Sequence, residues 1–139
     1  MRDGSGETLA LTNKFTDFPV VSPDGKLIAC FYQEETSSPL KVALLPSAGD
    51  APVQMLNLPN TYPWPSVRWH PDGRALSYLD PKDNAGNVWI CPLDRKPPWK
   101  FTDFQEEQIF AYSWSRDGRY LALARGAMNQ NVVMISRFK

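Results

Sequence analysis

The sequence is short of the residues that most often carry chemistry. Among its 139 residues it has a single histidine, His70, and two cysteines, Cys30 and Cys91. A structural zinc site takes about four nitrogen or sulfur ligands, and a catalytic serine triad would have to use His70 without the Gly-x-Ser-x-Gly elbow that presents such a serine. Because both cysteines lie in apolar runs, we interpret them as buried free thiols. The sequence therefore predicts no metal, no cofactor and no catalytic site.

An excess of charge and long apolar runs are also missing. The chain has 15 basic and 15 acidic residues, whereas surfaces that bind nucleic acid or anionic membranes need a surplus of Lys and Arg. No stretch approaches the roughly 20 apolar residues of a membrane span. Residues 1–13 are polar and glycine-rich, unlike a signal peptide. We expect a soluble, cytoplasmic chain with no nucleic-acid or membrane partner.

Helix signals are scarce. Thirteen prolines are spread along the chain, and proline in the interior of a helix removes a hydrogen bond and clashes with the preceding turn. The segments between the prolines are rich in strand-forming residues. The sequence therefore predicts an all-β fold.

A short motif occurs three times and gives the chain its organisation. Its copies are Ser22-Pro23-Asp24-Gly25-Lys26, His70-Pro71-Asp72-Gly73-Arg74 and Ser115-Arg116-Asp117-Gly118-Arg119. The aspartates lie 48 and then 45 positions apart, which is close to the period of a four-stranded propeller blade. Asp-Gly between apolar runs is typical of a hairpin turn, since glycine adopts positive φ without a Cβ clash. His70, in the place of a serine, is interpreted as a turn residue.

The segments around each motif repeat as well. Apolar residues flank each turn, and a small residue recurs five positions after each aspartate, as Ala29, Ser77 and Ala122. Near-continuous apolar strands are typical of sheets that pack on both faces. A third strand is expected at residues 41–45, 87–91 and 131–135, and an outer strand at 53–58 and 99–102.

These repeats predict four-stranded antiparallel blades of a β-propeller, about three in this chain. We place a preceding outer strand within residues 1–17, at residues 8–12, and blades at 18–60 and 61–104. A last blade without its outer strand occupies 105–139. Three blades expose apolar end faces. The alternatives are a homodimer, in which each N-terminal strand completes the last blade of the other copy in a six-bladed ring, and the C-terminal part of a longer propeller.

The turn motifs resemble those of TolB-like propeller repeats, a WD-repeat-like group, over most of the chain. The segment from Ser113 to Gly126 and the ending Val132 to Lys139 look like bacterial propeller tails, which in that group often follow a Ser/Thr kinase domain or a winged-helix domain. The resemblance implies a propeller fold. TolB-like propellers have six or more blades and TolB itself is exported, so the envelope role does not carry over to this chain.

Candidate contact residues are aromatic side chains in proline-rich loops and arginines near strand ends. Tyr62, Trp64 and Trp99 are candidates for binding a partner, since exposed aromatics often anchor interfaces. Arg68 and Arg125 are candidates for facing the central channel. The recurring aspartates admit a calcium site, but the turn explains each of them.

Three functions remain open at this point. The first is a non-catalytic module for protein–protein interaction or ligand sensing, because rigidly held loops carry recognition. The second is the propeller portion of a larger enzyme, such as a Ser/Thr kinase tail or a peptidase-associated propeller. The third, a small propeller enzyme, would need several His or acidic ligands converging on the channel.

Overall fold

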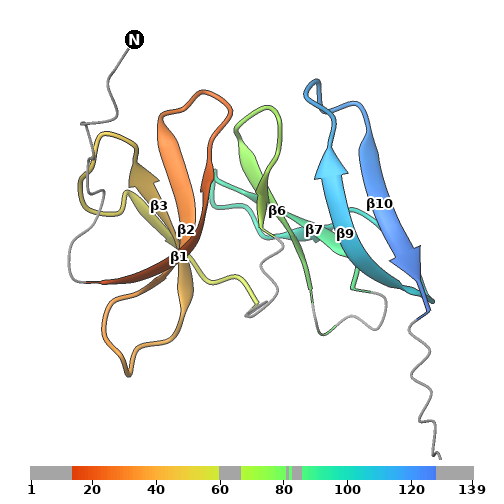
Figure 1. Ribbon diagram of the computed structural model, residues 1–139, viewed down its shortest axis with the longest axis horizontal. Helices are drawn as coiled ribbons and strands as arrows, with labels where there is room; N and C mark the ends of the chain where they lie inside the picture. Colours follow the sequence, from red (N-terminus) through yellow and green to blue (C-terminus); the bar gives the residue numbers. More distant parts are fainter. Residues whose placement is uncertain (1–13, 60–66, 81, 83–85, 128–139) are drawn as a thin grey trace, which may run out of the picture.

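The computed structural model describes residues 14–59, 67–80, 82 and 86–127. Within them the chain forms ten strands and no helix, in three antiparallel sheets that follow one another along the chain (Figure 1). The all-β, propeller-type architecture predicted from the repeats is confirmed. Among the same residues there is no helix with the length and apolar character needed to cross a membrane.

Each sheet is a meander of neighbouring strands. The first sheet contains β1 (Phe15–Val21), β2 (Leu27–Gln33), β3 (Lys41–Pro46) and β4 (Gln54–Leu56). The second contains β5 (Arg68–Trp69), β6 (Ala75–Leu79), β7 (Val88–Pro92) and β8 (Trp99–Lys100). The third contains β9 (Gln108–Trp114) and β10 (Leu121–Gly126). The strands expected at residues 8–12 and 131–135 lie outside the described residues.

The first strand starts earlier than the repeat suggested. β1 begins at Phe15, within the range 1–17 that the repeat assigned to a preceding outer strand. A register shift between Asp17 and Val20 lets the strand continue to pair with β2 beyond the turn motif, as far as Phe15 opposite Gln33. Such bulges extend a strand while bending it.

The repeated motif forms the tight turn between the first two strands of each sheet. Gly25 has φ of 72°, in the left-handed region that glycine adopts at little cost. The Ser22 hydroxyl donates to the Asp24 carboxylate at 2.7 Å and accepts the Leu27 N–H at 2.9 Å. Ser115 makes the same two bonds in the third sheet, to Asp117 at 2.6 Å and from the Tyr120 N–H at 2.9 Å.

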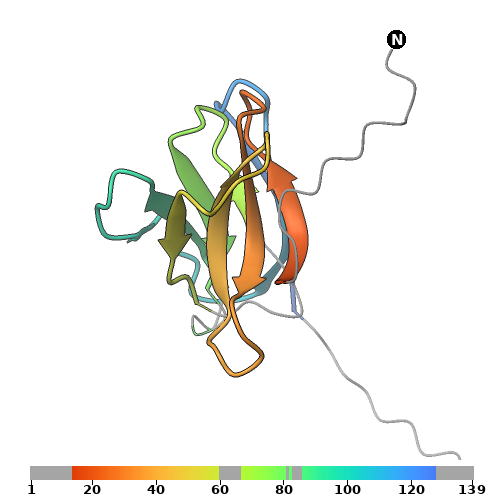
Figure 2. The same cartoon turned by 90° about the vertical axis from the view of Figure 1, so that its left-hand side faces the viewer.

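The three turns lie side by side at one end of the molecule (Figure 1; Figure 2). A Cβ placed on Gly73 would lie 3.9 Å from Pro23, and one on Gly118 would lie 3.5 Å from Pro71. Each turn therefore packs on the turn of the preceding sheet. His70 is a turn residue, as predicted, and its ring also reaches the third sheet, with its centroid 4.9 Å from that of Trp114.

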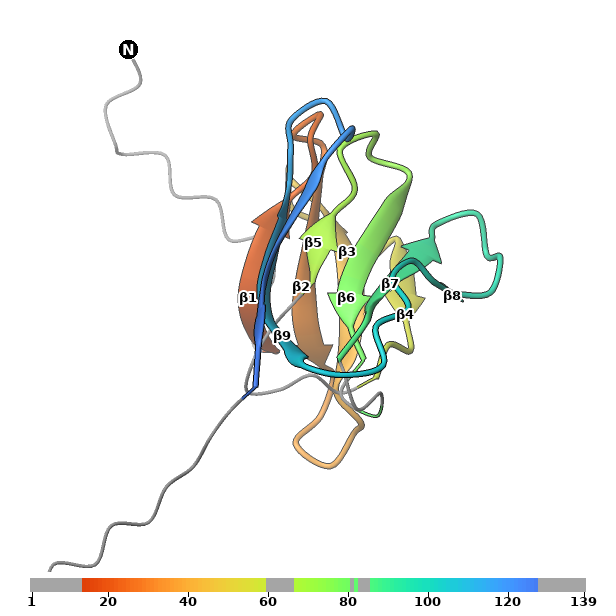
Figure 3. The same cartoon turned by 90° about the vertical axis from the view of Figure 1, so that its right-hand side faces the viewer.

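The core lies between the sheets. One cluster joins the facing sides of the first and second sheets and includes Phe31, Leu44, Leu56, Trp69 and Leu76. A second cluster joins the second and third sheets, which Figure 3 shows from the side of β9 and β10, and includes Val88, Ile109 and Tyr112. The second sheet thus packs on both faces, as its near-continuous apolar strands predicted. Cys30 and Cys91 are buried and free, also as predicted.

Buried polar groups hold the second sheet to its neighbours. Ser77, which is fully buried, accepts hydrogen bonds from the Trp114 indole at 2.9 Å and from the Tyr112 hydroxyl at 3.1 Å. In the first sheet the corresponding position is Ala29, which has no hydroxyl. There the Trp69 indole instead donates to the Val20 carbonyl at 2.9 Å.

A buried asparagine fastens the outer segment of the second sheet. The Asn87 side chain donates to the Phe104 carbonyl at 2.9 Å, and its oxygen accepts the Thr102 hydroxyl at 2.9 Å and the Phe104 N–H at 2.8 Å. The Thr102 oxygen in turn accepts the Val88 N–H at 3.0 Å. We call this arrangement the Asn87–Thr102 clasp; it replaces strand pairing where β8 ends.

Candidate functional site

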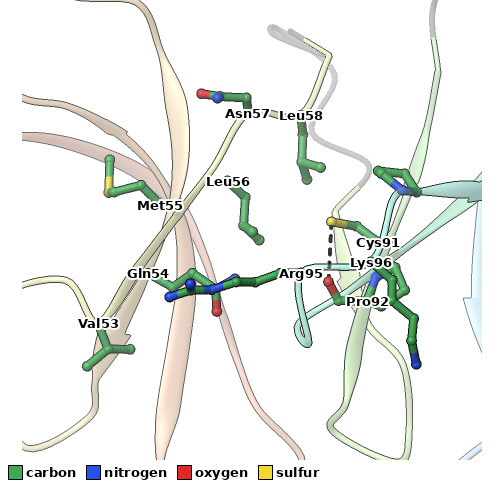
Figure 4. Close-up of a pocket in the computed structure, with 11 residues that line it drawn as sticks. Val53, Gln54, Met55, Leu56, Asn57, Leu58, Cys91, Pro92, Arg95 and Lys96 are labelled. Carbon is green, nitrogen blue, oxygen red and sulfur yellow. Dashed lines mark hydrogen bonds between the residues drawn. The ribbon is translucent and has the colours of Figure 1, made fainter.

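A groove of about 530 Å³ runs between the outer strand of the first sheet and the turn that follows β7 in the second. One wall is formed by residues 53–58, which include β4. The other wall comes from the second sheet and its outer turn, and consists of Cys91, Pro92, Arg95, Lys96 and Pro98 (Figure 4).

Strand pairing and packing fix the two walls relative to each other. Leu56 pairs with Val42 in β3 and is buried in the cluster that joins the first two sheets. The Gln54 side chain donates to the Leu93 carbonyl at 3.5 Å, across the groove. The Leu93 N–H donates to the Arg74 carbonyl at 3.0 Å, which attaches the turn to its own sheet. The groove is therefore built on ordered sheets and needs little rearrangement to accept a ligand.

The turn of residues 92–98 places the cation Arg95 beside the groove. Arg95 has φ of 68°, in a region that costs a non-glycine residue free energy. On one side of it, Asp94 and Lys96 form an ion pair at 2.7 Å, and the hydrogen bond from Lys96 lowers the pKa of the Asp94 carboxyl. Arg95 extends toward Gln54 (Figure 4), and no carboxylate of the described residues pairs with it.

The lining of the groove combines apolar surface with positive charge. Two of its 11 lining residues, Arg95 and Lys96, are cationic and none is acidic. The Cys91 thiol in its second wall donates weakly to the Pro92 carbonyl, and burial raises the pKa of this thiol. A thiol held protonated is a poor nucleophile. In the described part of the chain, no three His, Cys, Asp or Glu side chains gather as metal ligands would. The arrangement is suited to binding an anionic group beside an apolar one.

The contact residues expected from the sequence that the structure describes, Arg68, Trp99 and Arg125, do not line the groove. Tyr62 and Trp64 fall in residues 60–66, outside the described residues. Arg68 is exposed on β5 and donates to the carbonyl of Val67 at 2.9 Å. Their roles in binding, and that of Arg68 in a channel, stay predictions.

Arg125 is held by the segment that leads into the third sheet. Its guanidinium carbon lies 3.5 Å from the centroid of the Phe104 ring, a cation–π contact. It also donates to the Glu106 carbonyl at 2.9 Å and lies 3.7 Å from the Glu107 carboxylate. These contacts give Arg125 a structural role in fixing β10 to residues 104–107. Its expected position in a channel stays a prediction.

Of the sequence candidates among the described residues, Trp99 is the one that lies in an exposed aromatic cluster. It is 48% exposed on β8, and its ring centroid lies 5.7 Å from that of Phe101. Phe101 in turn contacts Trp114, with centroids 5.2 Å apart. The cluster does not line the groove.

The groove residues were missed by the sequence analysis. Gln54 and Arg95 are unremarkable in type, and both line the groove only because the first and second sheets pack together. The one local signal is the proline-flanked segment from Pro92 to Pro98, which carries two cations and a single acid. Such a loop on a rigid sheet is where binding residues concentrate.

The recurring aspartates accept hydrogen bonds within their own turns. The Ser22 hydroxyl and then the Lys26 N–H lower the pKa of the Asp24 carboxyl, and the Ser115 hydroxyl and the Arg119 N–H do the same for Asp117. Both carboxylates thus already accept hydrogen bonds within their own turn. These contacts explain the aspartates without an ion.

Comparison with known proteins gives a structural match. No family model matches the chain, and no curated protein matches it either. A solved structure described as "putative TolB from Agrobacterium tumefaciens" matches with a TM-score of 0.56 and 27% sequence identity, over 74% of this chain and 35% of that chain. The chain thus spans about a third of the length of that structure. Together with the three sheets, the match shows a TolB-like, propeller-type fold.

Proposed function

We propose that this chain is a non-catalytic β-propeller module that binds a protein partner, and that the groove beside Arg95 takes an extended, acidic segment of that partner. The observation that carries the proposal is the groove itself. It lies between two packed sheets, is lined by Leu56, Leu58 and Cys91, and has at one side the Arg95 guanidinium, which pairs with no carboxylate of the described residues.

The size and chemistry of the groove favour a short stretch of peptide. At about 530 Å³ it lies within the range of about 300–1,000 Å³ that small-ligand sites occupy, which is room for a few side chains. Burial of the partner's apolar side chains on the exposed Val53 and the half-buried Leu58 would provide most of the affinity. A carboxylate beside Arg95 would provide orientation, since guanidinium binds carboxylates in a fixed planar geometry.

The likeness to a TolB-like structure supports a role in recognition rather than chemistry. The matched region is about a third of that protein's length, so its whole function does not transfer to this chain. The supporting features within this chain are rigid sheets, outer turns of varied sequence and a lining with no acid–base pair.

The test is a comparison of two synthetic pentapeptides, blocked at both ends. One alternates leucine or valine with glutamate, and the other carries lysine in place of glutamate. We expect the acidic peptide to shift the backbone amide resonances of Gln54, Leu58 and Arg95 in a heteronuclear NMR titration. Binding should weaken as salt rises, because the charge contact is partly exposed.

Substitution of Arg95 tests how much its charge, rather than the shape of the groove, contributes to peptide binding. Arg95→Glu should lower the affinity for the acidic peptide by about tenfold or more and raise the affinity for the basic peptide. Arg116→Glu, an exposed arginine in the turn of the third sheet, is the matched control and should leave both affinities unchanged. Equal binding of the two peptides, or shifts outside the groove, would refute the proposal.

A further inference from the structure

The outer strand of the first sheet borders the groove with its backbone as well as its side chains. β4 is the last strand of that sheet and, among the described residues, pairs with β3 alone. The edge of such a strand carries N–H and C=O groups that point away from its partner strand. These groups are the ones that a further extended segment would bind.

The lining of the groove shows that it follows this edge. Residues 53–58 all line the groove without a gap, although successive side chains of a strand point to opposite faces of a sheet. Leu56 pairs with Val42 in the cluster shared with the second sheet, whereas Met55 pairs with Ala43 on the opposite face. Figure 4 shows Met55 and Leu56 on opposite sides of the strand. A groove that touches residues of both faces reaches the edge that the two faces share.

This edge lacks the features that protect an outer strand from pairing. Charged residues and prolines commonly serve that purpose, and residues 53–58 contain neither. In the second sheet, by contrast, the outer strand β8 ends in Lys100 and directly follows Pro97 and Pro98. Of these two outer strands, β4 is therefore the one suited to accept another strand.

The two faces beside the edge differ in chemistry. On the face turned away from the second sheet, Val53 and Met55 are 61% and 39% exposed. On the other face lies the turn with Arg95, which pairs with no carboxylate of the described residues. Side chains of an added strand would alternate between these faces. A segment in which apolar and acidic residues alternate therefore matches both faces at once.

We infer that the groove holds its acidic segment as a fifth strand of the first sheet, hydrogen-bonded along the edge of β4. The acidic side chains point to Arg95, and the apolar ones lie beside Val53 and Met55. This inference rests on the proposed function and specifies how the segment is bound. In this mode the main-chain hydrogen bonds provide affinity and the alternating side chains provide selectivity.

Single N-methylation of the acidic pentapeptide tests the backbone pairing. Five peptides each carry one methyl group, on successive backbone nitrogens, and their affinities are compared with that of the unmethylated peptide by NMR titration. In an added strand the N–H of every second residue points to β4. We expect methylation at those positions to lower the affinity by about tenfold or more, and methylation at the intervening positions to change it by less than about threefold.

The methylated series separates this inference from the proposed function. If the unmethylated peptide binds but the effect of methylation does not alternate, the strand pairing is wrong and the groove remains a peptide site. If the unmethylated acidic peptide does not bind, both proposals fail. Amide hydrogen exchange of the protein gives a second readout. Within residues 53–58, every second amide should exchange at least about tenfold more slowly in the complex, whereas uniform rates would contradict the pairing.

A substitution on the far face of β4 tests the placement of the apolar side chains. Met55→Ala should lower the affinity for the acidic peptide by about three- to fivefold, because a cross-strand contact is shortened. Val21→Ala is the matched control, since Val21 is an exposed apolar residue at the end of β1 that does not line the groove. It should leave the affinity unchanged. Equal affinities of the two variants would overturn the assignment of Met55 to the contact.

Discussion

Removal of the Ser77 hydroxyl should loosen the junction between the second and third sheets. A serine hydroxyl has one donor hydrogen and two acceptor lone pairs, and here all three are used. The hydrogen is donated to the Arg68 carbonyl at 3.3 Å, and the lone pairs accept from Trp114 at 2.9 Å and Tyr112 at 3.1 Å. Ser77→Ala leaves two donors of the third sheet without this acceptor.

The magnitude follows from the burial of those donors. Tyr112 is 7% exposed, so its hydroxyl has little access to replacement water, whereas Trp114 is only half-buried. A buried donor that loses its partner costs about 1–3 kcal/mol. With the full cost at Tyr112 and a partial one at Trp114, Ser77→Ala should lower the free energy of unfolding by about 2–3 kcal/mol.

Urea unfolding followed by tryptophan fluorescence measures this cost. Trp114 is itself a reporter of the junction, and an unchanged m-value would show that the comparison is two-state. Ser113→Ala, an exposed serine of β9, is the control and should stay within about 0.5 kcal/mol of the original chain.

A double-mutant cycle tests whether the lost hydrogen bonds cause the destabilisation by Ser77→Ala. Tyr112→Phe removes the donor, and it should cost less in the Ser77→Ala background than alone, with a coupling of about 1 kcal/mol. If the two costs simply add, or if Ser77→Ala is neutral, the hydrogen bonds do not hold the junction and the reasoning from their geometry fails.

Three further predictions concern thiols, turns and pH. Burial raises the pKa of Cys30 to about 11 and also raises that of Cys91. Iodoacetamide at pH 8 should therefore alkylate both thiols more slowly than in guanidinium, Cys30 by about a hundredfold, as followed by mass spectrometry. Gly118→Ala should cost about 1–2 kcal/mol in urea unfolding, because the turn needs φ of 69° there; an unchanged midpoint would show a relaxed turn. Serine hydroxyls lower the pKa values of Asp24 and Asp117 in the folded chain. The two carboxylates therefore contribute their full stabilisation at pH values above 3.8, the ordinary pKa of aspartate. This stabilisation is lost as the pH falls through their lowered pKa values in the folded chain. Unfolding between roughly pH 5 and 2 should show a shallower loss when both are changed to asparagine.

The turns and most strands could be predicted because their causes are local. Asp24, Gly25 and Ser22 make a turn from neighbouring atoms, and the same atoms recur in the third sheet. A strand such as β3, expected at 41–45 and found at Lys41–Pro46, is bounded by proline and glycine on the chain itself. Such signals depend only on neighbouring residues in the sequence and not on the packing of the rest of the chain.

The candidate site could not be predicted because its contacts are distant in sequence. Gln54 hydrogen-bonds the carbonyl of Leu93, which is 39 positions away in the sequence. Arg95 is positioned by a left-handed backbone conformation, which the sequence does not predict for an arginine. Ser77 and Asn87 had a visible signal, since Ser77 is a polar residue within an otherwise apolar strand and Asn87 directly precedes one. The partner that satisfies a buried polar group, however, is fixed only when the neighbouring sheet is in place.

The position of the groove follows from how twisted sheets pack. β1 and β5 come into close backbone contact, and the Trp69 indole hydrogen-bonds the Val20 carbonyl near this contact. Among the described residues, one long hydrogen bond joins the outer parts of the same two sheets, from Gln54 to the Leu93 carbonyl at 3.5 Å. Because strands twist progressively across a sheet, two sheets held at their first strands separate toward their last. The wedge-shaped opening at the rim is thus set by the core, whereas its charge is set by the exposed turn of residues 92–98. Changes in that turn can therefore alter the charge of the groove without disturbing the packing that creates it.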